Sequence, residues 1–243
     1  MAPGPRLILD IAEKRFAGAE TPVHANLRFD IAPSSVVALV GPSGVGKSTL
    51  LRMMAGIDQA FAGTITIDEV AAHAAPTPGF VFQDPRLLPW LTAAQNITAV
   101  DPRITHDAAI AALGRVGLTE VVDLFPHQLS GGMQRRVALA RAFSVNARLL
   151  LLDEPFVSLD RELVAEMHQV FGQLIAEARP TVVFVSHLID DAARLADRAI
   201  LLADRPAKIV ADIDLPTSPS ERDEATVVAY REQLQSASKR RTK

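Results

Sequence analysis

The sequence predicts an α/β fold with a central parallel sheet. Two apolar runs, Leu149–Leu152 and Thr181–Val185, lack polar alternation, as is typical of strands that are buried on both faces. A third apolar run, Val36–Val40, precedes a glycine-rich turn and a stretch that favours a helix. Strand, tight turn and helix in this order form the unit from which parallel sheets are built.

The composition sets broad limits on the class of protein. The 243 residues suffice for one large α/β domain or two small ones, and no break in composition favours two. A formal net charge of −3 does not indicate a protein that coats nucleic acid. Because the chain contains no cysteine, disulfides and thiolate metal sites are excluded, and Mg²⁺ bound by oxygen atoms is the metal to expect.

No signal for membrane insertion or secretion is present in the sequence. No segment approaches the roughly 18–20 uninterrupted apolar residues that span a bilayer, and residues 1–6 do not begin a signal peptide. We therefore expect a cytosolic chain. Hydrophobic residues nevertheless make up 49% of it, which fits either a large core or a surface buried against partners.

The turn after Val36–Val40 matches the phosphate-loop pattern at Gly41, Gly46, Lys47 and Ser48. In such a loop, glycines bring backbone N–H groups onto phosphate oxygens, and the helix start adds its dipole. Lys47 is expected to reach the β- and γ-phosphates, and the Ser48 hydroxyl to hold Mg²⁺. The predicted nucleotide-binding residues of this loop are Gly41, Pro42, Ser43, Gly44, Val45, Gly46, Lys47, Ser48 and Thr49.

A second helix start suited to an anion lies at Ser130, Gly131 and Gly132. Ser130 is a good N-cap for the following stretch rich in Ala, Leu and Arg, and the two glycines leave the backbone bare. One ATP does not need both helix starts from one molecule if they lie far apart. The economical arrangement is a head-to-tail homodimer, with each ATP between one chain's Lys47 loop and the other chain's Ser130 helix.

With both helix starts, the chain resembles the ATPase subunit of an ABC transporter over almost its whole length. The resemblance implies one ABC-type ATPase domain over residues 1–243, with a P-loop NTPase (RecA-like) core. It also implies an N-terminal antiparallel β-subdomain and an inserted α-helical subdomain at roughly residues 86–147. Period-two stretches within residues 7–16 and 26–31, together with Ile65 and Ile67, are consistent with the antiparallel strands.

Two adjacent carboxylates, Asp153 and Glu154, follow the run of four leucines. Adjacent strand residues point to opposite sides, so the two carboxylates are expected to do different work. We expect Asp153 to hold Mg²⁺ through water, and Glu154 to polarise the water that attacks the γ-phosphorus. Charges placed directly after a buried strand are costly unless they meet a cation.

The resemblance assigns four more residues. Gln83, whose amide both donates and accepts, is expected to contact Mg²⁺ and the attacking water. His187 is expected to contact the γ-phosphate and to hold the attacking water together with Glu154. Phe16 matches an aromatic that stacks on adenine, although Tyr is more frequent there and a core position is the alternative. Asp160 matches a residue that couples the two sites across the dimer interface, and a helix cap is the alternative.

The segment Leu87-Leu88-Pro89-Trp90 holds the chain's only tryptophan, and is either a local plug or a docking surface. The resemblance implies that an integral membrane permease docks near Gln83–Trp90. This segment and Arg205-Pro206 resemble importers of the nitrate, sulfonate and taurine group. The chain would then act at the cytoplasmic face of the inner membrane as a peripheral subunit, linked indirectly to a solute-binding protein.

Three alternatives stay open from the sequence. An exporter or cell-division complex would use the same ATPase with another membrane partner. An ATPase of this architecture that acts on nucleic acid is disfavoured by the net charge and by the lack of a coiled-coil insertion between Gln83 and Ser130. A simple phosphate-loop kinase or GTPase has no use for Ser130-Gly131-Gly132. The solute is selected by the permease and the binding protein, so this chain does not identify it.

Overall fold

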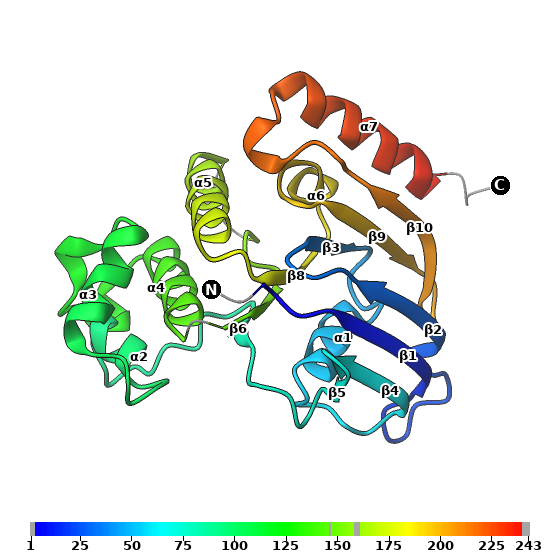
Figure 1. Ribbon diagram of the computed structural model, residues 1–243, viewed down its shortest axis with the longest axis horizontal. Helices are drawn as coiled ribbons and strands as arrows, with labels where there is room; N and C mark the ends of the chain where they lie inside the picture. The colour runs from blue at the N-terminus through cyan, green and yellow to red at the C-terminus, as the bar shows by residue number, and fades with distance from the viewer. Residues whose placement is uncertain (1–2, 146, 158–160, 240–243) are drawn as a thin grey trace.

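Two β-sheets form the framework of the protein (Figure 1). The computed structural model describes residues 3–145, 147–157 and 161–239. In the larger sheet, five strands are parallel and β10 pairs antiparallel with β9. Its strand order is β10 (Lys208–Asp214), β9 (Arg198–Ala203), β3 (Val36–Val40), β8 (Thr181–Ser186), β7 (Leu149–Asp153) and β6 (Gly79–Val81).

The smaller sheet is antiparallel, as the sequence predicts for the N-terminal part. Its order is β2 (His24–Ile31), β1 (Leu7–Lys14), β4 (Ala62–Ile67) and β5 (Val70–Ala71). Leu7, Leu9 and Ile11 of β1 are fully buried, and the residues between them are exposed, so one face of the sheet covers a core. The short β5 was not anticipated.

Helix α1 (Lys47–Met54) lies between the two sheets (Figure 1). Its buried residues, among them Leu50 and Met54, pack in one core with Val37 and Leu39 of β3 and with the smaller sheet. The alternate residues of β3 face a different core on the other side of the sheet. Strand β3 is therefore apolar on both faces, which explains its unbroken apolar run.

The second core lies on the opposite face of the six-stranded sheet. Phe171, Phe156 and Phe184 meet there edge to face, with ring centroids 5.9 to 6.5 Å apart. Residues of six helices take part in this core: α2 (Ala93–Thr98), α3 (His106–Arg115), α4 (Gly131–Ser144), α5 (Arg161–Ala178), α6 (Ile189–Leu195) and α7 (Glu224–Lys239). From the sequence we predict a final helix from Glu224 to Gln235, and α7 continues beyond it to Lys239, whereas α6 was not anticipated.

Three α-helices follow β6 and form one side of the molecule (Figure 1). They are α2 (Ala93–Thr98), α3 (His106–Arg115) and α4. Residues 86–147 contain less helix than expected, because α3 ends before Gly117, whose φ is +69°, and 3₁₀ turns at Thr119–Val121 and Pro126–Gln128 lead to α4. A further 3₁₀ turn, Pro219–Glu221, precedes α7. None of the helices described is both long and apolar enough to cross a bilayer.

Candidate nucleotide site

The loop between β3 and α1 needs glycine for steric reasons. Gly44 and Gly46 have φ of +80° and +108°, in the region that side chains disfavour. A Cβ on Gly46 would lie 2.4 Å from Val23 Cγ1 and 2.6 Å from His24 Cε1. A Cβ on Gly41 would lie 2.4 Å from the carbonyl oxygen of Leu202. The loop therefore packs closely against Val23, His24 and Leu202, and its backbone conformation requires glycine at positions 44 and 46.

Lys47 is buried beneath this loop. Its Nζ donates hydrogen bonds to the carbonyl oxygens of Gly41, at 2.7 Å, and Pro42, at 3.0 Å. Burial lowers the pKa of Lys47, while the carboxylates of Glu154 and Asp153 act in the opposite direction. An ammonium group is thus held at the loop by backbone carbonyls, near two acids at the end of β7.

Ser48 and Asp153 bring together two oxygen donors. The Ser48 hydroxyl donates to Asp153 Oδ1 at 2.7 Å, and the Asp153 side chain is buried. Burial raises the pKa of Asp153, which the Ser48 hydrogen bond partly offsets. Among the described residues, no cluster of three or more His, Cys, Asp or Glu side chains is placed to hold a metal. The pair suits a hard cation whose other ligands are water or phosphate oxygens, as Mg²⁺ prefers.

Glu154 leaves the strand in a strained conformation. Its φ is +49°, which costs a residue other than glycine about 1 kcal/mol or more, and its N–H donates to Val185 O at 3.1 Å. Its Oε2 lies 3.5 Å from Gln83 Nε2 and 3.5 Å from His187 Nδ1. The ends of β6, β7 and β8 therefore bring together the three side chains that the sequence assigns to the attacking water.

Ser130 caps α4 at an exposed position. Its Oγ accepts a hydrogen bond from the Met133 N–H at 3.2 Å, as expected of an N-cap. A Cβ on Gly131 would meet nothing within 4 Å, whereas one on Gly132 would lie 2.3 Å from Leu163 Cδ2. Gly131 thus leaves open space at the helix start, and Gly132 allows close packing on α5. Helices α4 and α1 pack into different cores and are separate in the view of Figure 1.

Phe16 lies two residues beyond the end of β1. Its side chain is 44% exposed, so it is not a core residue, which was the alternative from the sequence. Lys14 Nζ lies 5.0 Å from the centroid of the Phe16 ring. The ring presents an exposed aromatic surface. Asp160, with Ser158 and Leu159, lies outside the described residues.

The segment around Trp90 is buried in one part and exposed in another. Leu87 packs against the second core, whereas Trp90 is 68% exposed. The buried amide of Asn96 accepts from the Leu88 N–H at 2.7 Å and donates to the carbonyl oxygens of Leu88, Leu91 and Thr92. This side chain fixes the turn that presents Trp90. This role of Asn96 was not anticipated from the sequence, although an Asn shortly after a proline-rich turn is a usable signal.

Two further positions near the site were not anticipated. Arg135 of α4 donates to Gln83 O at 3.1 Å, and thereby holds the segment that carries the Gln83 amide. His24 is fully buried beneath the glycine-rich loop, with Nε2 3.2 Å from Gly46 O. Burial lowers the pKa of His24 to about 4, so the ring is neutral at physiological pH. Nothing in the sequence around His24 indicates that its side chain is buried beneath the glycine-rich loop.

Comparison with known proteins agrees with this geometry. The family model described as ABC transporter matches residues 24–157. The aliphatic sulfonates import ATP-binding protein SsuB 1 of Pseudomonas aeruginosa (strain UCBPP-PA14) is 37% identical over 231 residues, covering 92% of this chain and 93% of the relative. SsuB 2 of Rhodococcus jostii (strain RHA1) is 46% identical over 195 residues, covering 78% and 76%.

Solved structures lead to the same family. A dimeric structure of the ATP-binding cassette MJ0796, in a post-hydrolysis state bound to ADP and Pi, superimposes with a TM-score of 0.76. The sequences are 30% identical, and the match covers 86% of this chain and 98% of that one. A second dimeric structure of the same bacterial ABC transporter cassette also gives a TM-score of 0.76, with 29% identity. The chain belongs to the ABC transporter family, as one of its ATP-binding subunits.

Proposed function

We propose that two copies of this chain hydrolyse ATP at shared sites and thereby drive uptake of a small solute through a separate membrane permease. The observation that carries the proposal is the convergence of Lys47, Ser48, Asp153 and Glu154 at one end of the parallel sheet. Phosphoryl transfer needs positioning and charge neutralisation more than covalent chemistry, and these four groups supply both.

The phosphates of ATP are bound by the glycine-rich loop. Residues 41–49 offer backbone N–H groups at the start of α1, and the Lys47 ammonium neutralises negative charge on the β- and γ-phosphates. Phe16 offers an exposed ring on which adenine stacks. Ser48 and Gln83 would hold Mg²⁺ through their side-chain oxygens, and Asp153 would hold it through water. When bound, this ion neutralises charge on the phosphate oxygens.

Glu154 acts on the attacking water. Its Oε2 faces both Gln83 and His187, so a water between these groups is oriented by an acceptor and two polar neighbours. Glu154 accepts the hydrogen bond from this water, and His187 donates to the γ-phosphate. All three side chains come from one protomer, at the ends of neighbouring parallel strands.

The γ-phosphate also meets the partner protomer. Ser130 and Gly131 are exposed at the start of α4, which belongs to a different core from α1. A helix start of this kind attracts an anion, and the anion available to it is the ATP held by the other copy. Asp160 is then a residue that couples the two sites. The dimeric structures of the related cassette support this arrangement.

The permease docks on the side that carries Trp90. A cleft of about 820 Å³ is connected to this segment by Arg141, which lines it and donates to the carbonyl oxygens of Pro85 and Arg86. Phe80, Val100 and the ion pair of Arg103 with Asp101 also line the cleft. Apolar side chains beside charged groups suit a short amphipathic segment of a membrane protein. Docking there places the chain at the cytoplasmic face of the inner membrane as a peripheral subunit. The sulfonate import named for the relatives favours a small solute of the sulfonate, taurine or nitrate type.

Reconstitution tests this function. The chain is co-expressed with a candidate permease, and the purified complex is placed in vesicles with a solute-binding protein. We expect ATPase activity that an alkanesulfonate, taurine or nitrate stimulates several-fold, together with uptake of that solute. The same complex carrying Glu154→Gln controls for contaminating ATPases. Failure of any importer permease to co-purify, or solute movement in the export direction, would contradict the importer assignment.

A further inference from the structure

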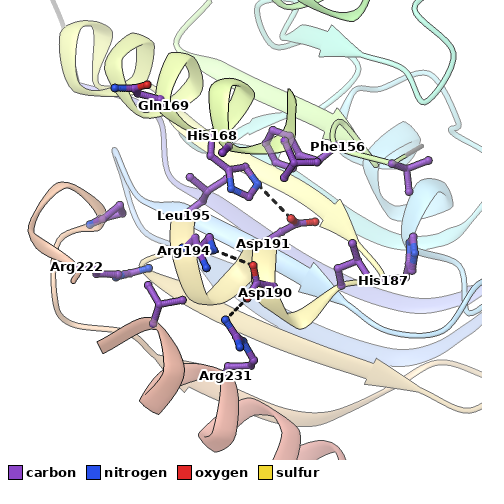
Figure 2. Close-up of a pocket in the computed structure, with 16 residues that line it drawn as sticks. Phe156, His168, Gln169, His187, Asp190, Asp191, Arg194, Leu195, Arg222 and Arg231 are labelled. Atoms are coloured by element: carbon purple, nitrogen blue, oxygen red, sulfur yellow. Dashed lines mark hydrogen bonds and ion pairs between the residues drawn. The ribbon is translucent and has the colours of Figure 1, made fainter. Parts of the chain in front are cut away.

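A cavity of about 950 Å³ lies beside the proposed catalytic groups, bordered by α5, α6 and α7 (Figure 2). His187 and Phe156, two residues beyond Glu154, are among the residues that line it. The arginines of the cavity are engaged by the protein itself. Arg194 and Arg231 pair with Asp190 and Glu224, and Arg222 donates to four backbone carbonyls. The buried side chains of the cavity wall form a separate cluster around Asp191.

Asp191, on α6, is a buried carboxylate whose two oxygens both have partners. His168 Nε2 of α5 donates to Oδ1 at 3.2 Å, and the Ser186 hydroxyl donates to Oδ2 at 2.6 Å. The residue is 3% exposed, and a carboxylate at such a position is costly unless it is hydrogen-bonded. The three side chains therefore hold one another in place, as Figure 2 shows for His168 and Asp191.

Ser186 connects this cluster to His187. Besides donating to Asp191, the Ser186 hydroxyl accepts a hydrogen bond from the Leu188 N–H at 2.9 Å. One hydroxyl thus links the residues on either side of His187. Because Asp191 fixes that hydroxyl, the backbone turn that carries the His187 ring is fixed through it.

His168 also contacts the segment after Glu154. Its ring meets the Phe156 ring edge-on, with centroids 4.5 Å apart and planes at 89°. Phe156 is itself buried in the second core. The His168 side chain therefore contacts Asp191, which holds the turn that carries His187, and Phe156, which lies two residues beyond Glu154. His187 Nδ1 and Glu154 Oε2 are 3.5 Å apart.

We propose that His168, Asp191 and Ser186 form a positioning relay that holds His187 against Glu154 during ATP hydrolysis. The relay rests on the proposed function, because it acts through the roles given there to His187 and Glu154. His168 is a positioning residue, since it contacts Asp191 and Phe156, which lie next to the segments that carry His187 and Glu154. Its loss should slow the chemical step and leave ATP binding intact.

Variants of His168 in the full-length protein test the relay. His168→Phe keeps a ring against Phe156 but removes the donor to Asp191, whereas His168→Gln keeps a donor at a similar reach. We expect single-turnover hydrolysis to fall about tenfold in His168→Phe and to recover to within about twofold of the parent in His168→Gln. The dissociation constant for ATP should stay within about twofold in both. Gln169→Ala, at the exposed neighbouring position of α5, is the matched control.

A double-mutant cycle separates positioning from a general structural role. If His168 acts through His187, adding His168→Phe to His187→Ala causes no further loss. The relay would be overturned if His168→Phe lowered the rate of hydrolysis by the same factor in the parent and in His187→Ala. A parallel loss of ATP affinity, or no recovery of the rate in His168→Gln, would also overturn it. If His168→Phe hydrolysed ATP at the parent rate while His187→Ala was slow, the relay would be overturned but the proposed role of His187 would stand. Parent-rate hydrolysis by His187→Ala would overturn the proposed role of His187, and the relay with it.

Discussion

The Ser48 hydroxyl donates to Asp153 Oδ1 at 2.7 Å, although 105 residues separate the two in the sequence. One comes from the first turn of α1 and the other from the end of β7. The parallel sheet makes this meeting possible, because the carboxyl ends of its strands lie at one edge and α1 begins there. The pair is the strongest structural support for the proposed magnesium site.

Replacing Ser48 tests that site. In Ser48→Ala the cation loses one oxygen ligand, and Asp153 loses its hydrogen-bond donor, so we expect the Mg²⁺ concentration for half-maximal ATPase activity to rise about tenfold or more. Ser48→Thr keeps the hydroxyl and should stay within about threefold of the parent. A magnesium titration of ATPase activity measures both. An unchanged titration curve for Ser48→Ala would place the ion elsewhere.

Glu154→Gln should separate binding from turnover. The amide keeps the shape of the side chain but is a poor acceptor for a water proton, so hydrolysis should fall about 100-fold or more. ATP binding and ATP-dependent dimerisation should remain, because Lys47 and Ser130 are unaltered. Glu177→Gln, an exposed position on α5, serves as the control. If Glu154→Gln turned over ATP at the parent rate, another group would have to be the base.

Gly46→Ala should damage folding and ATP binding together. Its backbone φ of +108° and the 2.4 Å approach of Val23 Cγ1 leave no room for a methyl group. We expect a loss of about 2 kcal/mol or more in the free energy of unfolding, and a large loss of ATP affinity. Gly172→Ala, in the middle of α5 with open space around it, should be neutral or stabilising by up to about 1 kcal/mol. Denaturant unfolding and nucleotide titration check both.

His24 predicts a pH dependence of stability. Its pKa is lowered from an ordinary value near 6.5 to about 4, because burial disfavours the charged ring. Between these values the unfolded chain binds a proton that the folded chain does not, so stability falls as the pH drops through this window. The loss reaches roughly 3 kcal/mol at about pH 4, at 1.36 kcal/mol for each pH unit.

The His24→Leu variant isolates this contribution, because Leu fills a similar volume and does not titrate. Denaturant unfolding at several pH values between 7 and 4 gives the free energies of the parent and the variant. The parent should lose stability relative to His24→Leu as the pH falls. A constant difference between the two proteins over this range would show that His24 is not the group concerned.

The sequence predicts the α/β class, the antiparallel N-terminal strands and the parallel strands, because unbroken apolar runs and period-two alternation are local properties of the chain. It also indicates the chemistry of Lys47 and Asp153, because Lys47 follows a glycine-rich turn and Asp153 follows a run of four leucines, and both are local patterns. Contacts such as His168 with Asp191, or Asn96 with Leu88, depend on packing between elements, and no local pattern reports them. The left-handed backbone of Glu154 is likewise set by its bond to Val185 of the neighbouring strand.

The sharing of each ATP between two protomers is tested most directly by mixing two inactive variants, Lys47→Ala and Ser130→Arg. Each homodimer lacks an intact site, whereas the mixed dimer regains one, formed by Lys47 of one protomer and Ser130 of the other. We predict that mixing restores ATP-dependent dimerisation, read by sedimentation, together with measurable ATP hydrolysis. A mixture that neither dimerises with ATP nor hydrolyses it, or a parent monomer that hydrolyses ATP at full rate, would contradict the shared site.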